Sequence, residues 1–491
     1  MVAVWGVACE RASCSSFALV MRPRVRMIEG ACRRLIKLRE SFAMKWVADK
    51  ARWAREMFLG RAPVAVVLAS LLAGAVVAKE PESWPQWRGV ARDGHSQSTG
   101  LARDWNEQPP RLEWMSEGLG GGYASVSIAD GKIFTMGNVE GGQAVIALDQ
   151  QDGHVLWKQL VTEQVPQHGY EGSRCTPTFD DGRLYVVASS GRIVCLNAGD
   201  GDVIWARDFS DWGGRMMSGW GFSESPLVDG DRVICTPGGE QGTVVALNKR
   251  TGANVWAAQV PNQIGDGKNH NDTGLNPGAA YSSVVISNAA GVKQYVQLLG
   301  QGVVGIRASD GRYLWGYEDA ANNVANIPTP IPVGDTIFCS TGYGTGSALL
   351  EISGRGNNIS AREVYFLDQR TFQNHHGGII LVGEYLYSGH RHNEGFPICV
   401  ELATGEVVWG GNQRGEGSGS AAVAYADGLL IYRYQNGTVA LVEATPDGYE
   451  LKGSFQPEFQ ERESWAHPVI VDGRLYLREQ DKLMCYDLRA R

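Results

Sequence analysis

Short runs of alternating apolar and polar residues, each broken by a glycine turn, recur along most of this chain. Alternation with a period of two predicts β-strands that bury one face, and a tight Gly-containing turn between two such runs predicts a hairpin. Seven runs have this form: SVSIADGKIFTMG, TPTFDDGRLYVVAS, SPLVDGDRVICTPGG, TPIPVGDTIFCSTG, GGIILVGEYLYSGH, AAVAYADGLLIYRY and HPVIVDGRLYLREQ.

A second kind of hairpin follows most of these runs and carries tryptophan in its second strand. Its five copies read ALDQQDGHVLWK, CLNAGDGDVIWA, ALNKRTGANVWA, GIRASDGRYLWG and CVELATGEVVWG. A glycine stands four residues before each tryptophan, where the turn requires a positive φ. This spacing is turn geometry and not a catalytic constellation. The repeated tryptophans are Trp157, Trp205, Trp256, Trp315 and Trp409.

The two hairpins together form a unit of four antiparallel strands that returns every 43 to 59 residues, which is the size of a propeller blade. Eight units can be counted, with Phe366 expected in the tryptophan place of the fifth and Leu451 in that of the seventh. The last unit stops after three strands at Asp487, and residues 110–117, with Trp114, are expected to supply its fourth strand. The sequence therefore predicts an all-β, eight-bladed propeller whose ring closes through an N-terminal strand and removes its exposed edges.

An apolar, uncharged run covers residues 62–78 and follows Arg61. It predicts a signal peptide cleaved after Ala78, with translation expected to begin at Met44 or Met57. A transmembrane anchor is the alternative, although 17 residues are short for a span of about 20. The expected organisation is a targeting region over residues 1–78, an extension over 79–109 and the propeller over 110–491.

Charge and cysteine content narrow the function. After position 78 the chain has 32 basic and 48 acidic residues, a net charge of −16. Such a charge disfavours nucleic acid and anionic membranes as partners. The six remaining cysteines form no CxxC or adjacent pair and lie in apolar strand runs, so buried free thiols are expected. A monomer in the periplasm or the secreted fraction is expected, without a stable membrane anchor after cleavage.

The motif AxDxxxGxxxW, complete in Ala147, Asp149, Gly153 and Trp157, resembles the tryptophan-docking repeat of the pyrroloquinoline quinone (PQQ) enzyme propellers. The propeller of the outer-membrane β-barrel assembly machinery (BamB) has the same repeat. The opening WPQWRGVARDGHSQSTGL is similar to the start of exported PQQ-like repeat proteins of bacteria. The resemblance implies the fold over about 400 residues, with Trp114 and the five repeat tryptophans as interblade packing residues, and it leaves the function open.

Candidate functional residues lie in the long connections, which should share one face of the ring because the short glycine turns share the other. His375, His376, His390, His392 and Glu394 fall in two connections of one unit and could hold a metal or an acid–base site, or could simply shape the rim through hydrogen bonds. No metal site is assigned.

Other connections carry aromatic and charged residues. Tyr170, Trp220 and Trp465 could stack on a flat ligand or pack loop upon loop, and Arg174 could bind a carboxylate. His467, close to Trp465, is a further ligand-binding candidate. The catalytic candidates are Glu171 and Glu224, each of which could equally be half of an interblade ion pair.

Three functions remain. The first is an exported ligand- or protein-binding scaffold resembling the barrel-assembly propeller, with a small molecule or a periplasmic protein as partner. A carbohydrate or polymer binder is a further possibility, given the aromatic and amide-rich rim. The alternative is a PQQ-dependent alcohol or sugar dehydrogenase with Ca²⁺, for which Glu171, Glu224, Asn276 and Asp272 could supply ligands. The adjacent cysteines and long insertions of the familiar alcohol dehydrogenases do not occur in this sequence.

Export with cleavage after Ala78 should leave a mature chain beginning at Lys79, because the apolar run ends in small residues that signal peptidase accepts. Mass spectrometry of the protein from a periplasmic or culture fraction measures this. Abundant peptides from before Ala78 would show instead an anchor or an unprocessed segment.

Overall fold

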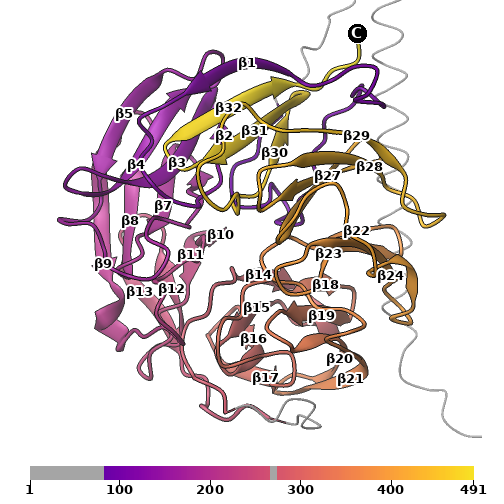
Figure 1. The fold of residues 1–491 in the computed structure, drawn as a ribbon. Coiled ribbons are helices and arrows are strands. Elements are labelled where there is room, and N and C mark those ends of the chain that lie inside the picture. Colours follow the sequence, from indigo (N-terminus) through magenta and orange to yellow (C-terminus); the bar gives the residue numbers. More distant parts are fainter. Residues whose placement is uncertain (1–81, 266–273) are drawn as a thin grey trace, which may run out of the picture. The chain divides into compact units, whose positions relative to one another are not determined.

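A computed structural model describes residues 82–265 and 274–491, which form eight four-stranded antiparallel sheets around a ring (Figure 1). The predicted eight-bladed propeller is therefore confirmed. The predictions for Met44, Met57, residues 62–78 and Asp272 lie outside the described residues. No helix in the described ranges is long and apolar enough to cross a membrane.

Each of blades 1 to 7 uses four consecutive strands, from the innermost to the outermost. Blades 1 to 4 comprise β2 (Ser127–Ala129), β3 (Lys132–Val139), β4 (Gly142–Asp149), β5 (Val155–Leu160); β6 (Thr178–Asp180), β7 (Arg183–Val187), β8 (Arg192–Asn197), β9 (Val203–Asp208); β10 (Leu227–Asp229), β11 (Arg232–Cys235), β12 (Val244–Asn248), β13 (Asn254–Ala258); β14 (Val285–Ser287), β15 (Gln294–Leu299), β16 (Gly302–Arg307) and β17 (Tyr313–Tyr317).

Two short 3₁₀ helices, η1 (Phe209–Trp212) and η2 (Ala289–Gly291), accompany the strands. Blades 5 to 8 comprise β18 (Ile331–Val333), β19 (Thr336–Thr341), β20 (Gly346–Arg355), β21 (Asn358–Asp368); β22 (Ile380–Val382), β23 (Tyr385–His390), β24 (Phe396–Glu401), β25 (Val407–Gly410); β26 (Ala421–Ala426), β27 (Leu429–Tyr434), β28 (Val439–Glu443), β29 (Leu451–Phe455); β30 (Val469–Val471), β31 (Arg474–Glu479), β32 (Lys482–Asp487) and, from the other end of the chain, β1 (Arg111–Ser116).

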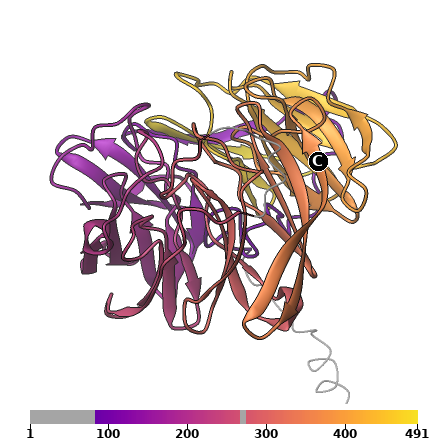
Figure 2. The ribbon, with the colours of Figure 1, turned by 90° about the horizontal axis from the view of Figure 1, so that it is seen from below.

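Blade 8 closes the ring as the sequence predicts. β1 pairs antiparallel with β32, placing Arg111 opposite Asp487 and Trp114 opposite Cys485. Figure 1 shows the indigo β1 beside the yellow β32, so residues far apart in the chain complete one sheet. In the view of Figure 2, the magenta blades stand across the ring from the orange and yellow ones.

Tryptophans of the outermost strands lie against the turn glycines of the next blade. A Cβ on Gly201 would come 2.7 Å from the indole of Trp157, so only glycine leaves room for this contact. The same contact joins Trp205 to Gly252, Trp256 to Gly311 and Trp114 to Gly153. The indole N–H of Trp205 also donates a hydrogen bond across the blade boundary, to the carbonyl oxygen of Lys249 in blade 3 at 3.0 Å.

The tryptophan place of blade 5 belongs to Tyr365, and the prediction of Phe366 is wrong. A β-bulge after Leu349 shifts the register, so that Tyr365 occupies the same position relative to the bulge as Trp157 does in blade 1. Tyr365 contacts Gly405 of blade 6 and donates a hydrogen bond to the carbonyl oxygen of Leu402 at 2.7 Å. Phe366 packs instead into the cluster shared with blade 4.

The prediction for blade 7 is also wrong, since Leu451 is 37% exposed. Leu451 matches Val155 of blade 1 in register, which leaves Gly453 at the tryptophan place. A Cβ on Gly453 would come 2.9 Å from the Cβ of Trp105, a buried residue of the N-terminal extension. The indole of Trp105 packs in the core cluster shared by blades 7 and 8, 5.5 Å from the ring of Phe455 between centroids. Trp105 therefore supplies, from a distant part of the chain, the ring that blade 7 lacks.

The N-terminal extension also ties together the innermost strands of several blades. Arg92 donates hydrogen bonds to the carbonyl oxygens of Ser225, Pro226 and Val284, which belong to blades 3 and 4. Arg88 reaches the carbonyl oxygen of Ile379, beside blade 6. Both arginines are buried and have left-handed backbones, with φ of 59° and 60°. Such strain persists only where the surroundings fix it.

The six cysteines of the described residues are buried and unpaired, as predicted. Burial raises the pKa of each thiol, for example that of Cys175 to about 12. These groups act as small apolar packing residues.

Truncation of Trp105 tests whether its ring takes the tryptophan place of blade 7. The Trp105→Ala variant is expected to lose about 3 to 5 kcal/mol of unfolding free energy, because the indole leaves a cavity between blades 7 and 8. Leu451→Ala, at the place predicted from the sequence, should cost about 1 kcal/mol or less because its side chain is partly exposed. Denaturant melts of both variants measure the difference, and equal costs would contradict the assignment.

Candidate functional site

A cavity of about 390 Å³ opens on the face that carries the long connections between blades. Its lining comes from loops that precede the innermost strands and from turns between the second and third strands. Seven of the ligand-binding candidates lie in this lining: Tyr170, Arg174, Trp220, His376, His392, Trp465 and His467. The structure thus brings together residues spread over almost 300 positions of the sequence.

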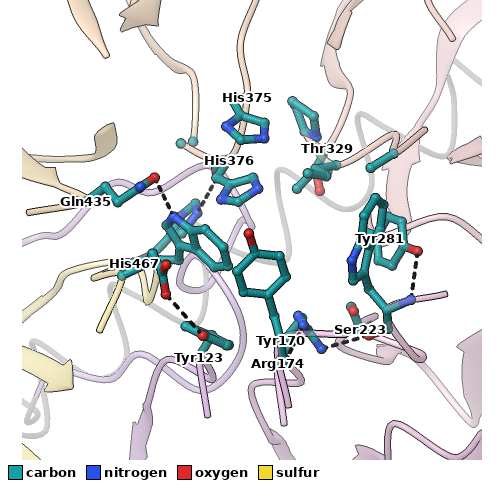
Figure 3. A pocket seen from close by; sticks show the side chains of 18 of the residues that line it. Tyr123, Tyr170, Arg174, Ser223, Tyr281, Thr329, His375, His376, Gln435 and His467 are labelled. Carbon is teal, nitrogen blue, oxygen red and sulfur yellow. Dashed lines mark hydrogen bonds between the residues drawn. The ribbon is translucent and has the colours of Figure 1, made fainter. Parts of the chain in front are cut away.

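Aromatic rings form one wall of the cavity (Figure 3). The Trp465 ring lies 4.9 Å from that of Tyr123 and 5.0 Å from that of Tyr170 between centroids. The Trp465 indole N–H donates to Oε1 of Gln435 at 2.8 Å, which fixes its orientation. Tyr170 is 51% exposed with a left-handed φ of 50°, an uncommon conformation for a bulky residue.

Arg174 lies beside these rings and is held by main-chain oxygens. Its guanidinium donates to the carbonyl oxygens of Trp220 at 2.8 Å, Tyr170 at 2.6 Å and Gly169 at 3.1 Å. The same group lies 5.5 Å from the centre of the Tyr123 ring. Burial lowers the pKa of Arg174 to about 10, so it remains a cation at neutral pH.

Three histidines adjoin the aromatic wall, with the ring of His376 4.3 Å from that of Trp465 between centroids. The ring of His375 lies 3.7 Å from that of His376 and 4.1 Å from that of His392 between centroids. Nδ1 of His375 is 2.6 Å from Oγ of Ser420, and its Nε2 is 3.1 Å from the hydroxyl of Tyr343. Burial, reinforced by the neighbouring His392, lowers the pKa of His375 to about 3.

His376 and His392 also have lowered pKa values because of burial, and His467 falls to about 4. Nε2 of His467 lies 3.1 Å from the carbonyl oxygen of His376, which can only accept, so Nε2 carries the proton and donates it. All four histidines are therefore neutral at physiological pH. They offer hydrogen-bonding nitrogens without positive charge.

Other candidates lie away from the cavity. His390 is fully buried behind it, where its Nδ1 accepts the main-chain N–H of Gln373 at 3.2 Å. Glu394 forms a rim ion pair with Arg414 at 2.6 Å. Glu171 is exposed and does not belong to the lining in the described part of the chain.

Glu224 is buried beneath the loops and is also absent from the lining. Its carboxyl group accepts the main-chain N–H of Thr236 at 2.6 Å and the hydroxyl of the same residue at 3.0 Å. Burial raises the pKa of Glu224 to about 7, against the opposing effects of Thr236 and the nearby cation of Arg92. The group therefore titrates near neutrality inside the protein.

Several lining residues were not predicted. Tyr123, Tyr281, Tyr343 and Glu463 reach the cavity from loops that carry no distinctive motif, and Trp87 and Arg88 reach it from the N-terminal extension. The sequence WPQWRG contained a signal for the last two, since a polar turn rich in tryptophan and arginine precedes the closing strand. Its path across the ring depends on tertiary contacts.

One group among the described residues has the geometry of a metal site, and it lies elsewhere. Asp149, Asp152 and His154 bring their ligand atoms within 4.8 Å of one another on the exposed turn between β4 and β5. This turn lies on the opposite face from the cavity. Exposed acidic turns of this kind are common without an ion, so it is not assigned as a site.

The family model described as outer membrane protein assembly factor BamB matches residues 91–212 and 141–411, which together exceed half of the chain. The chain belongs to this family of PQQ-like repeat propellers.

Individual relatives match shorter stretches. BamB of Alteromonas naphthalenivorans is 33% identical over 101 residues, 19% of this chain and 24% of that protein. Polyvinylalcohol dehydrogenase of a Pseudomonas species is 27% identical over 274 residues, which cover 48% of this chain and 41% of that protein. BamB of Shewanella oneidensis is 26% identical over 165 residues, which cover 31% of this chain and 38% of that protein. The chain thus spans less than half the length of each of these relatives.

Solved structures share the fold. BamB of Moraxella catarrhalis superposes with a TM-score of 0.53 at 11% identity, covering 78% of this chain and 98% of that one. Quinohemoprotein alcohol dehydrogenase of Comamonas testosteroni superposes with a TM-score of 0.59 at 13% identity, covering 85% of this chain and 82% of that one. At these identities the likeness shows a common propeller and nothing of the ligand.

The raised pKa of Glu224 predicts how the stability of the protein changes with pH. The native state holds this proton up to about pH 7 and the unfolded chain releases it near 4.5, so the contribution of Glu224 to stability falls as the pH rises through this window. Relative to the parent, Glu224→Gln should gain about 3 kcal/mol between pH 4.5 and 7.5. The buried histidines act in the opposite direction, so denaturant melts must compare parent and variant at each pH. A constant difference would contradict the assignment.

Proposed function

We propose that this protein is an exported binding propeller that holds a small molecule in its central cavity. The main support is the form of the cavity, which combines a rigid aromatic wall with a few fixed polar groups. Its volume of about 390 Å³ lies within the range of about 300 to 1,000 Å³ common for small-molecule sites. Loops of all eight blades contribute to the lining, together with Trp87 and Arg88 of the N-terminal extension, so the whole ring builds the cavity.

The proposed location is the periplasm or the secreted fraction. The apolar run before Ala78 supports export, and matched relatives are named outer membrane protein assembly factors, which supports an envelope location. The proposed organisation keeps the targeting region at residues 1–78, the extension at 79–109 and the propeller at 110–491. The contacts of Arg92 and Trp105 support treating the extension as part of the folded unit.

A PQQ-dependent dehydrogenase is less well supported by the cavity. Calcium requires six to eight oxygen ligands, usually with several carboxylates. In the described lining Glu463 is the single carboxylate, and it lies 3.4 Å from the hydroxyl of Tyr123. Glu171, Glu224 and Asn276 do not line the cavity. The described residues therefore do not fit the calcium that accompanies this quinone.

A protein partner is the second candidate. The outermost strands of blades 5 to 8 expose one large apolar side chain each, and those of blades 1 to 3 together expose five. These residues are Leu156, Leu160, Val203, Ile204 and Val255. Exposed apolar groups that gather on strand edges favour association with another protein. The relatives named as assembly factors support the same candidate.

Blocking the cavity tests the proposed function. Ser223 lines the cavity, and Ser223→Phe should fill part of it, whereas Ser309→Phe places the same ring on an exposed turn of the opposite face. Native mass spectrometry of protein purified from the exported fraction should show a small-molecule adduct on the parent and on Ser309→Phe. The adduct should be lost or reduced at least about tenfold in Ser223→Phe, because a filled site binds nothing.

Dye-linked oxidation of alcohols and sugars in the presence of PQQ, with and without Ca²⁺, tests the dehydrogenase alternative on the same preparations. We expect no calcium-dependent turnover. An adduct of equal intensity on all three proteins, no adduct on the parent, or calcium-dependent turnover would each contradict the proposed function.

A further inference from the structure

We propose that the ligand of this cavity is a ring-bearing carboxylate whose acid group is received by Arg174 without a metal ion. This inference rests on the proposed function and names the chemical class of the small molecule. Three independent features support it: the charge of the lining, the fixed geometry of Arg174, and the arrangement of rings beside it.

The charge of the cavity opposes the charge of the protein. The whole chain has a net charge of −8, and the part after position 78 has −16. The described lining nevertheless contains the cations of Arg88 and Arg174 against the single carboxylate of Glu463, while its histidines are neutral. A cationic pocket within an acidic protein concentrates anionic ligands and excludes cationic ones.

Neither arginine has an acidic partner within ion-pair distance among the described residues. Carbonyl oxygens accept the N–H groups of both terminal nitrogens of Arg174, which holds the guanidinium in place and leaves its charge uncompensated. The N–H of Nε remains as its donor for a carboxylate. Arg88 is 6% exposed, and its Nε lacks a hydrogen-bond partner in the described structure. Burying a cation without an anion is costly, and a carboxylate ligand would remove that cost.

The rings next to Arg174 select a flat ligand body. Figure 3 shows Arg174 below Tyr170 at one end of the cavity and His375 with His376 at the other. One group of rings beside the arginine consists of Tyr170, Trp465 and Tyr123. A second group consists of Trp220 and Tyr281, whose ring centroids lie 5.7 Å apart. Aromatic faces of this kind stack on aromatic rings and on the C–H faces of sugars alike.

The histidine wall determines what the far end of the ligand carries. Both ring nitrogens of His375 already have partners in Ser420 and Tyr343, so His376 offers the nitrogens for a ligand at this end. Because His376 is neutral, it can donate to or accept from a hydroxyl or carbonyl group but brings no positive charge to a second carboxylate. The acid group is therefore expected at the Arg174 end. Aromatic acids and sugar acids share this chemistry, a planar or pyranose ring with one carboxylate, and the experiment distinguishes them.

Matched acids and neutral analogues test the inference on the full mature chain. Tryptophan fluorescence titrations, supported by calorimetry, would compare benzoate with benzamide and galacturonate with galactose. At least one acid should bind the parent about 10- to 100-fold more tightly than its neutral analogue, as charge-assisted hydrogen bonds predict. A preference in the benzoate pair identifies an aromatic acid, and one in the galacturonate pair identifies a sugar acid.

Variants of arginine identify the receiving group. Arg174→Gln should remove the preference for the acid while the neutral analogue still binds, which shows that the cavity persists. Arg174→Lys should retain part of the preference because it keeps the charge. The control is Arg215→Gln, since Arg215 is an arginine outside the lining that hydrogen-bonds Asn262 at 3.0 Å. It should bind like the parent.

Equal affinity of the parent for acid and neutral analogue would overturn the inference. So would an unchanged acid preference in Arg174→Gln, or no binding of either acid at millimolar concentration. The comparison on the parent decides the matter even where Arg174→Gln does not fold. A neutral adduct that disappears in Ser223→Phe would overturn this inference and leave the proposed function intact. The absence of any Ser223-dependent adduct would overturn both.

Discussion

The pairing of β1 with β32 is the constraint on which the rest of the structure depends. It joins residues 111–116 to residues 482–487 and turns a row of eight sheets into a closed ring. Closure fixes how far apart the innermost strands stand, and therefore the width of the space that Arg92 and Arg88 span to reach main-chain oxygens of blades on different sides. Without this pairing the sheets at the two ends of the row would expose unpaired strand edges, and the cavity would have no defined size.

Burial of charge without a partner connects this architecture with the proposed function. The carbonyl oxygens that hold Arg174 belong to loops whose positions the closed ring determines. The guanidinium is therefore held where no acidic side chain of the described residues forms an ion pair with it. Burial neutralises the surrounding histidines through their lowered pKa values, yet it cannot neutralise an arginine. The same physical effect thus produces an uncharged wall and a charged end within one cavity.

The sequence pattern predicted the repeat correctly and failed where a blade departs from it. In blades 1 to 4 and 6 the glycine turn fixes the tryptophan position by local geometry, so counting along the chain was sufficient. In blade 5 the β20–β21 hairpin is long, so its turn lies far from the β-bulge and the spacing from the turn no longer marks the tryptophan place. The register at the bulge places Tyr365 there and not Phe366. In blade 7 the ring comes from Trp105, which no local spacing relates to Gly453.

The sequence by itself determined the eight blades, the closing strand, the face on which the long loops gather and the buried state of the cysteines, because each follows from strand alternation and turn geometry within a few residues. Only the tertiary structure decided that His390 and Glu224 are buried away from the cavity, that Glu394 pairs on the rim, and that Arg88 joins Arg174 in the lining. These outcomes depend on how deep each loop lies in the closed ring, and depth is set by contacts between blades that are distant in the chain.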